Sequence, residues 1–361
     1  AATSPVRPEV LEAMRPYLTD VFGNPSSHHT VGEAAASALD DARRRVARAL
    51  GMRAGDVVFT SGGTEANNLA VKGITLGALA KGKRHLIVSP IEHESILESA
   101  DFLRRFHGIE VSLLPVDGCG RIAASDLQAL LRDDTALVSV GHANNEIGTV
   151  QDAASLADLA RGAGVPLHLD AVQSAGWLPL DGLGADAVSI AGHKLGAPKG
   201  TGALAVRGRV PLEPLLHGGG QERGRRSGTE NVAGAVALAT ALDLAEAERV
   251  HVVTRVGRAT ARFISAVLTA VPQAALTGDP AQRLPGTASF TFAGTSGESV
   301  LLELERRGVV SSSGSACAAG SDEPSPVLLA CGIDAAIAQT SVRFTFGRAT
   351  LPDDAPEHLA R

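Results

Sequence analysis

The chain has 361 residues, of which 44% are hydrophobic and 20% charged, and its formal net charge is −6. This length favours two domains or one large one, and the composition is that of a globular chain with a sizeable core, which excludes disordered and collagen-like classes. Because the chain is mildly acidic and only 3% aromatic, it lacks the basic stripe and stacking platforms of nucleic-acid binders, so we expect no direct nucleic-acid partner.

Neither a membrane span nor an export signal is indicated. The longest apolar candidate, residues 232–242, runs into Asp243 and is shorter than the roughly 18 residues of a membrane helix. Residues 1–10 carry Glu9 and no apolar core, so we expect no signal peptide and no membrane partner. The three cysteines are too few, and odd in number, for a disulfide framework. We therefore predict a protein of the reducing cytoplasm.

Short apolar runs alternate with helical patterns over the first two thirds of the chain. Several runs are continuous and β-branched, as strands buried on both faces are. The predicted strands are residues 56–60, 85–89, 110–114, 136–140, 166–169, 185–191 and 202–206. The helical candidates between them include residues 33–50, 65–81, 95–107 and 153–163. This alternation predicts an α/β fold with a mainly parallel sheet and helices on both faces.

The last third of the chain has a different pattern. Residues 228–271 are Ala-rich and helical with a charged middle, which predicts a helix that bridges two domains. The later segments, 287–292, 297–307, 309–312 and 341–346, indicate a smaller α+β unit. We expect a large domain over residues 12–250 and a small domain formed by residues 1–11 and 251–361.

Two segments mimic nucleotide-binding motifs without meeting their requirements. Residues 77–83 have the spacing of a P-loop, but Arg84 replaces the magnesium-binding hydroxyl residue and the run lies inside a helical pattern. Residues 118–120 mimic a dinucleotide fingerprint but follow Pro115 and Asp117, which favours a turn. No CxxC, HExxH or GxSxG occurs, so structural zinc, zinc protease and hydrolase-elbow interpretations have no support, and we predict no metal site.

A stronger signal follows the first predicted strand. Gly62, Gly63 and Thr64 lie between that strand and a helix. Free N–H groups and the positive end of a helix dipole at such a turn favour an anion, and a phosphate above all. A threonine in this position can instead be only a helix N-cap, and the loop alone does not decide between the two.

Two other predicted strands end in residues with reactive side chains. Asp170 follows one strand, and His193 and Lys194 follow the next. Parallel strands place their carboxyl ends at one sheet edge, where ligands bind in open α/β folds. An aspartate, a lysine and a phosphate loop at one edge suit pyridoxal 5′-phosphate, with Lys194 forming the Schiff base and Asp170 keeping the pyridine nitrogen protonated. A surface lysine and a helix-capping aspartate are the alternative.

Nine motifs, in order along the chain, carry a family resemblance. They are TSGGTEANN at 60–68, EHE at 92–94, NNEIG at 144–148, DAVQ at 170–173, GHK at 192–194, GGGQER at 218–223, RSGT at 226–229, SSGSAC at 312–317 and VRF at 342–344. With these motifs the chain resembles the cysteine desulfurases of the iron-sulfur assembly and nitrogen-fixation type (IscS/NifS-like), class V aminotransferases of the aspartate-aminotransferase fold. The resemblance implies a large cofactor-binding domain with a mainly parallel sheet and a smaller α+β domain.

The resemblance implies roles for four residues around the cofactor ring and the substrate. His93 would stack on the ring and could help to move protons. Gln173 would hydrogen-bond the phenolic oxygen, and Asn145 would face both the cofactor and the substrate carboxylate. Arg343, whose guanidinium can make two parallel hydrogen bonds, would bind the α-carboxylate of the amino acid.

It also implies a phosphate site that is shared between two subunits. Gly63, Thr64 and His193 would hold the phosphate together with Thr229 from the other subunit of a homodimer. One family feature is missing, because Ala191 stands where a serine usually precedes the lysine by three residues. The loss of that hydroxyl removes a hydrogen bond worth about 1.5 to 3 kcal/mol, so cofactor affinity could be lower.

Cys317 determines the predicted reaction. It lies in a run of small residues, 311–321, which predicts a mobile loop, whereas Cys331 beside Leu328 and Leu329 is typical of a buried structural cysteine. The resemblance implies that the Cys317 thiolate attacks the sulfur of bound L-cysteine after Lys194 removes the α-proton. The products are L-alanine and a persulfide on Cys317, and the loop resembles the group that hands sulfur directly to scaffold proteins.

Several alternatives stay open at this point. A selenocysteine lyase or an aminotransferase would use the same pocket, and a sulfur-relay protein would keep the fold with poor turnover. The intact Lys194, Asp170 and Arg343 argue against the last of these, and Cys317 argues against a plain transaminase. Iron-sulfur clusters, thiolated tRNA, thiocofactors and sulfur-modified DNA are all possible destinations of the sulfur.

Overall fold

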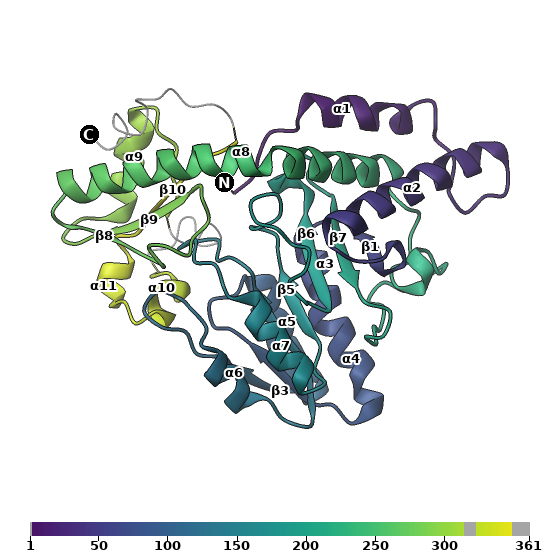
Figure 1. Ribbon diagram of the computed structural model, residues 1–361, viewed down its shortest axis with the longest axis horizontal. Coiled ribbons are helices and arrows are strands. Elements are labelled where there is room, and N and C mark those ends of the chain that lie inside the picture. The colour runs from purple at the N-terminus through teal and green to yellow at the C-terminus, as the bar shows by residue number, and fades with distance from the viewer. Residues whose placement is uncertain (1, 314–322, 349–361) are drawn as a thin grey trace.

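A seven-stranded sheet and a three-stranded sheet, joined by one long helix, make up the fold (Figure 1). The computed structural model describes residues 2–313 and 323–348. We call the seven-stranded sheet with its helices the large unit. The three-stranded sheet with α9, α10 and α11 is the small unit.

The large sheet has the strand order β1-β7-β6-β5-β4-β2-β3. Only β7 runs antiparallel to its neighbours; the other pairs are parallel, which confirms the predicted mainly parallel sheet. All seven predicted strands are present, as β1 (Val57–Thr60), β2 (His85–Val88), β3 (Glu110–Leu113), β4 (Thr135–Gly141), β5 (Leu167–Asp170), β6 (Ala187–Ala191) and β7 (Gly202–Val206).

Helices cover both faces of this sheet because its strands are apolar on both faces. Side chains alternate along a strand, so Ile87 enters one core while Leu86 and Val88 enter the other. The first core is shared with α1 (Pro8–Met14), α2 (Thr30–Ala49), α6 (Ala124–Leu130), α7 (Ala153–Gly162) and the first half of α8 (Val232–Ala270). The second is shared with α3 (Gly63–Asn68), the π-helical turn Leu69–Gly73, α4 (Ile74–Ala78) and α5 (Glu94–His107).

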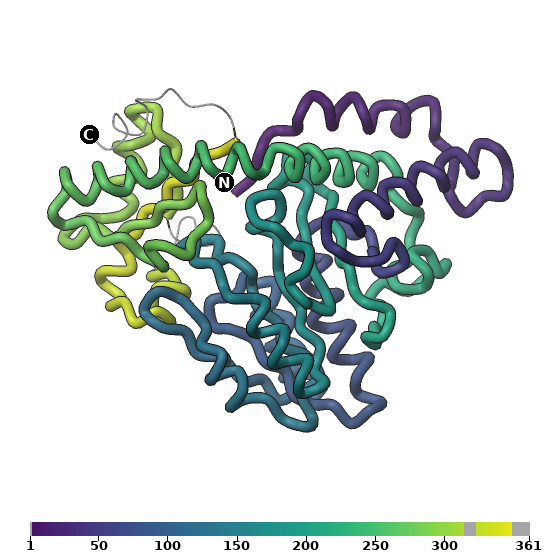
Figure 2. The backbone as a smooth tube through the Cα atoms, viewed as in Figure 1, coloured from purple at the N-terminus to yellow at the C-terminus, as the bar shows by residue number. Residues whose placement is uncertain are grey.

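The predicted bridging helix is present as α8, which crosses from the large unit to the small unit (Figure 2). Beyond its middle, Val256 and Phe263 pack against Phe290 and Phe344 of the small sheet. The small unit is built from β8 (Ala274–Leu276), β9 (Thr287–Phe292), β10 (Val342–Thr345), α9 (Gly297–Arg306), α10 (Pro326–Ala330) and α11 (Ala335–Ala338). Its strands are antiparallel in the order β10-β9-β8.

Short turns connect these elements, and two of the short segments bear on local predictions. Single 3₁₀ turns occupy Arg15–Leu18, Ala54–Asp56, Leu79–Lys81, Gly192–Lys194 and Glu222–Gly224. Residues 118–120 form a turn with Gly120 at φ +74°, as predicted. Residues 309–312 form no strand of their own; Ser312 alone pairs with Arg343.

The division into domains at residues 12 and 250 stays a prediction. Two contacts bear on its N-terminal part. Val10 is buried in the first core of the large unit, and the Ser4 N–H donates to the His193 carbonyl at 2.9 Å. The residues before position 12 therefore pack largely against the large unit.

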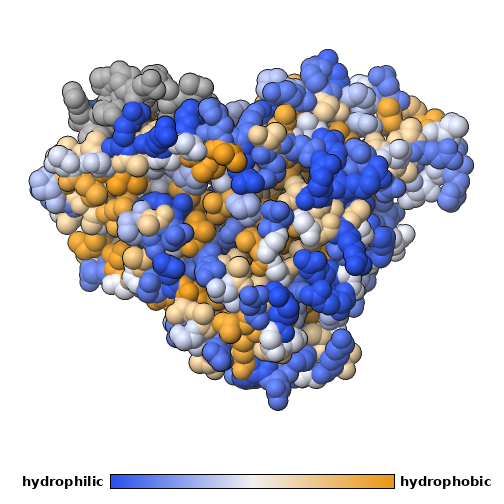
Figure 3. Space-filling view, viewed as in Figure 1, coloured by the Kyte–Doolittle hydropathy of each residue, from blue (hydrophilic) through white to orange (hydrophobic). Residues whose placement is uncertain are grey.

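Within the described ranges, no helix is both long and apolar enough to cross a membrane. Figure 3 shows hydrophilic side chains over much of the visible face of the large unit, with hydrophobic patches more frequent over the small unit.

A close approach between two glycines sets the position of the loop after β1. A Cβ atom at Gly202, on β7, would lie only 2.6 Å from the carbonyl carbon of Gly62. We expect Gly202→Ala to cost about 1 to 3 kcal/mol because the loop must shift, and to lower the melting temperature. Gly55→Ala, where a Cβ meets nothing within 4 Å, is the matched control. Equal melting temperatures for the two variants would contradict this expectation.

Candidate active site

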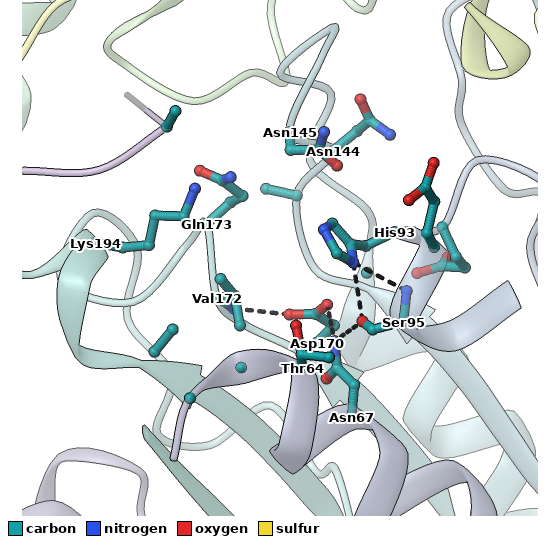
Figure 4. Close-up of a pocket in the computed structure, with 18 of the residues that line it drawn as sticks. Thr64, Asn67, His93, Ser95, Asn144, Asn145, Asp170, Val172, Gln173 and Lys194 are labelled. Carbon is teal, nitrogen blue, oxygen red and sulfur yellow. Dashed lines mark hydrogen bonds between the residues drawn. The ribbon is translucent and has the colours of Figure 1, made fainter. Parts of the chain in front are cut away.

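A cavity of about 620 Å³ lies at the carboxyl ends of the large-sheet strands. Residues that follow β1, β2, β4, β5 and β6 line it, and Arg343 of β10 and Val327 of α10 contribute from the small unit. Figure 4 shows the side chains that converge there. The predicted sheet-edge site is therefore present, and both units contribute to it.

The loop after β1 approaches the cavity as bare backbone. The Thr60 hydroxyl donates to the Gly62 carbonyl at 3.0 Å, and Gly62 has φ +152°. A Cβ at Gly63 would lie 2.8 Å from Val172 and 3.2 Å from Ala191, so only glycine fits without displacement. Gly62 is the N-cap residue of α3, so Thr64 is not the cap and the capping interpretation of Thr64 is wrong.

Asp170 is a buried carboxylate at the end of β5. It accepts hydrogen bonds from Asn67 Nδ2 at 2.7 Å and from the Val172 N–H at 2.9 Å (Figure 4). Burial raises the pKa of Asp170, and the hydrogen bonds from Val172 and Asn67 act in the opposite direction. A cation in the cavity would stabilise its ionised form.

Asn67 is a site residue to which the sequence analysis gave no role. Its Nδ2 also donates to Ser95 Oγ at 3.0 Å, which links α3, α5 and β5. Its Oδ1 is buried and has no hydrogen-bond partner among the described residues. Its spacing in the sequence could have placed it at the site, because Asn67 lies four residues after Gly63 in α3 and so on the same helix face.

His93 is held with one ring nitrogen fixed. As the N-cap of α5, its Nδ1 accepts the Ser95 N–H at 3.0 Å and lies 2.9 Å from Ser95 Oγ. Because Nδ1 accepts a backbone hydrogen bond, the neutral ring carries its proton on Nε2. The imidazole lines the cavity (Figure 4).

Lys194 ends the turn that follows β6, and its side chain points into the cavity, as does that of Gln173 (Figure 4). The neighbouring His193 Nδ1 lies 3.2 Å from Thr3 Oγ1. Burial, together with the positive charges of Lys194 and Lys199, lowers the pKa of His193. Thr3, in the N-terminal segment, also lines the cavity, and no motif in the sequence indicated this position.

Arg343 approaches the cavity from β10. Its Nη1 donates to the Asn145 carbonyl at 2.6 Å, while its buried Nε has no partner among the described residues. Burial lowers the pKa of Arg343, and the nearby Glu146 opposes this effect. The Arg343 side chain lines the cavity, and a guanidinium in such a place is suited to a ligand carboxylate.

Two further buried carboxyl groups flank the site, and neither was predicted. Burial raises the pKa of Glu146 to about 7, although it accepts a 2.5 Å hydrogen bond from Ser325 Oγ. Burial and the nearby Asp170 raise the pKa of Glu92 to about 8, against a hydrogen bond from the backbone of Gly141. Both therefore favour the neutral acid more than an exposed glutamate does.

The cavity brings together most of the predicted site residues, whose individual roles stay predictions. They are Gly63, Thr64, His93, Asn145, Asp170, Gln173, His193, Lys194 and Arg343. Ala191 also lines the cavity. Thr229 is exposed and does not line the cavity of its own chain. Cys317 lies outside the described residues.

These residues fit pyridoxal 5′-phosphate. A buried carboxylate, a lysine side chain that enters the cavity and a glycine loop with no room for a Cβ atom at Gly63 match the pyridine nitrogen, the aldehyde and the phosphate of this molecule. Asp170 would hold the ring, Lys194 the aldehyde carbon and Gly63 and Thr64 the phosphate.

The comparisons with known proteins agree with this site. A model of the family "Aminotransferase class-V" matches residues 1–355. The chain belongs to this family. It is 44% identical over 356 residues to a cysteine desulfurase IscS of Dictyoglomus turgidum, which covers 98% of this chain and 90% of that protein.

Two solved structures are also similar. A NifS-like protein has a TM-score of 0.91 and 33% identity, covering 99% of this chain and 95% of its own. The structure of SspA in complex with cysteine has a TM-score of 0.83 and 34% identity, and the match covers 97% of this chain and 98% of that chain. The predicted resemblance to cysteine desulfurases, the fold type and the dependence on pyridoxal 5′-phosphate are confirmed.

The buried Glu92 gives a prediction for stability. Its pKa of about 8 lies above its value of 4.5 in the unfolded chain, so the native state holds a proton that the unfolded state releases. The stabilisation that this bound proton gives to the native state is complete below pH 4.5. It is lost as the pH rises toward 8, by about 1.4 kcal/mol of unfolding free energy per pH unit. In the cofactor-free protein, Glu92→Gln should therefore remove part of the fall in melting temperature between about pH 5 and pH 8.

Glu98→Gln, at an exposed position of the following helix α5, is the control and should follow the wild-type profile. A wild-type profile for Glu92→Gln would contradict the proposed burial of a neutral acid.

Proposed function

We propose that this cysteine desulfurase transfers the sulfur of L-cysteine to Cys317 as a persulfide and releases L-alanine. The observation that carries the proposal is the convergence of the Asp170, Lys194 and Arg343 side chains on one cavity. Asp170 would contact the cofactor ring, Lys194 would provide the amine, and Arg343 would bind the carboxylate of an amino acid substrate. The cysteine bound to the related SspA supports the choice of substrate.

Substrate orientation depends on Arg343 and Asn145. The 2.6 Å hydrogen bond from Nη1 to the Asn145 carbonyl fixes the orientation of the guanidinium. A bidentate contact to the α-carboxylate would then direct the rest of the amino acid toward Lys194. When bound, pyridoxal phosphate serves as an electron sink for negative charge at the substrate α-carbon.

Proton movements are assigned to two residues of the chain. Lys194 Nζ would remove the α-proton, and His93, whose Nδ1 accepts the Ser95 N–H, would donate a proton from Nε2 within the cavity. Asp170 stays ionised when a protonated ring nitrogen faces it, since an adjacent positive charge opposes the effect of burial on its pKa.

The sulfur-accepting step belongs to Cys317. Its thiolate attacks the substrate sulfur, a sulfur–sulfur bond forms, and the carbon–sulfur bond breaks with its electron pair left on the carbon fragment, which takes up protons to become alanine. Support comes from Ser312, a described residue five positions before Cys317. Ser312 exchanges backbone hydrogen bonds with Arg343 at 2.7 and 3.1 Å, and five residues of chain can span up to about 17 Å.

Replacement of Cys317 separates this proposal from its rivals. Cys317→Ser should lower alanine and sulfide formation from cysteine by about two orders of magnitude or more, because the nucleophile is removed. Bound cofactor, measured by visible absorbance, should remain. Cys119→Ser is the control, since Cys119 lies outside the cavity.

Alanine release that persists in Cys317→Ser would contradict the assignment and favour a lyase that needs no thiol. Transfer of the amino group to an added keto acid would favour an aminotransferase. Slow turnover in the wild type itself would favour the sulfur-relay protein.

We also propose a homodimer in which Thr229 completes the phosphate site of the partner subunit. The exposed position of Thr229, away from its own cavity, supports this assignment. Thr229→Ala should weaken cofactor binding about 10-fold or more, because a hydrogen bond to a charged phosphate is lost. Equilibrium dialysis of pyridoxal phosphate measures the effect, and unchanged affinity would contradict the shared site.

The persulfide requires an acceptor, for which we propose a sulfur-acceptor protein such as an iron-sulfur scaffold in the cytoplasm. Iron-sulfur cluster assembly is suggested by the relatives named IscS, and thiolation of tRNA is the alternative. Capture of acceptors on protein that carries the Cys317 persulfide tests both.

A further inference from the structure

The segment that ends at Thr229 is attached firmly to β1 of its own chain. The buried Glu222 accepts hydrogen bonds from Arg43 Nη1 and Nη2 at 2.6 and 2.9 Å and from the Phe59 N–H at 3.1 Å. Glu222 and Arg223 have φ values of +48° and +60°, a left-handed backbone that residues with a Cβ rarely adopt. Such strain persists only when surrounding contacts hold it, and Glu222 supplies them.

A second carboxylate, that of Glu65, joins the C-terminal end of this segment to the loop after β1. Arg226 Nε donates to Glu65 Oε1 at 2.8 Å, and Nη2 donates to Oε2 at 3.3 Å. The same Oε2 accepts the N–H of Ser61, in the loop after β1, at 2.8 Å. Glu65 directly follows Thr64, and Arg226 precedes Thr229 by three residues.

The connection from Arg226 to Thr229 is itself constrained. The Ser227 N–H donates to the Leu216 carbonyl at 3.1 Å, and the Gly228 N–H donates to Gln221 Oε1 at 2.9 Å. A displacement of Arg226 would therefore move the turn that presents Thr229.

We infer that Glu65 and Arg226 are positioning residues that link the phosphate site of one chain to the site that Thr229 completes in its partner. This inference rests on the shared phosphate site proposed above. The ion pair acts through Thr229, so its loss should loosen the cofactor in the partner's pocket rather than in the pocket of its own chain. Burial raises the pKa of Glu65, but hydrogen bonds from Arg226 and Ser61 outweigh this and lower it, which keeps the bridge ionised.

The test uses mixed dimers, produced by co-expression of two chains with different affinity tags. One chain is wild type and the other carries Arg226→Gln. The loaded dimer is dialysed, the remaining pyridoxal phosphate is fixed to Lys194 with borohydride, and the mass of each chain reports the occupancy of its own pocket. This readout does not depend on activity.

We expect the pocket of the wild-type chain to lose cofactor about 3- to 10-fold faster than in the wild-type dimer, while the variant chain's own pocket keeps its rate. Arg226→Lys, which keeps the charge but not the two-nitrogen contact, should give an intermediate rate. Arg225→Gln is the matched control, because Arg225 makes one 3.3 Å contact to the Gly55 carbonyl and none to Glu65. Glu65→Gln combined with Arg226→Gln in one chain should be no worse than either alone.

Faster loss from the variant chain's own pocket, equal loss from both pockets, no change, or additive effects of the two substitutions would overturn the inference. A mixed dimer in which one chain carries Thr229→Ala distinguishes failure of the Glu65–Arg226 link from failure of the shared phosphate site. If Thr229→Ala loosens the partner's pocket and Arg226→Gln does not, the link fails and the shared site stands. If Thr229→Ala has no effect, the shared site itself fails.

Discussion

The site depends on a carboxylate that is kept in a buried position. Removal of a charge from water is unfavourable, so Asp170 can be buried only with strong hydrogen bonds and a positively charged partner. Asn67 and the Val172 N–H provide the hydrogen bonds. In our proposal the protonated ring nitrogen of the cofactor would supply the positive charge, which would give the protein a direct free-energy reason to bind that ring.

The other buried ionisable groups around Asp170 are arranged to avoid charge. Burial raises the pKa values of Glu92 and Glu146, and it lowers those of His142 to about 4 and His168 to about 3. Near neutral pH these histidines carry no charge, and Glu92 is mainly protonated. Burial therefore reduces the charge that Glu92, His142 and His168 contribute near the cavity.

Packing between the two units determines where the Arg343 guanidinium lies. Arg343 belongs to the small sheet but hydrogen-bonds to the Asn145 carbonyl of the large unit, and Ser325 Oγ reaches the buried Glu146. An apolar cluster containing Ile91, Ile147, Val327 and Leu328 packs at the same junction. The residues on both sides of Cys317 are thus connected to the wall of the cavity whose substrate Cys317 is proposed to attack.

The strands, the long helix and the sheet-edge position of Asp170 and Lys194 were determined by the sequence itself. Apolar periodicity and glycine turns are local properties, and the carboxyl ends of parallel strands meet at one edge by topology. The tertiary structure decided that Gly62 rather than Thr64 caps α3, and that Asn67, Glu92 and Thr3 belong to the site. It also paired Arg43 with Glu222 and Glu65 with Arg226. Hydrogen bonds and burial between residues far apart in the chain leave no periodic trace in the sequence, so only the folded chain brings these partners together.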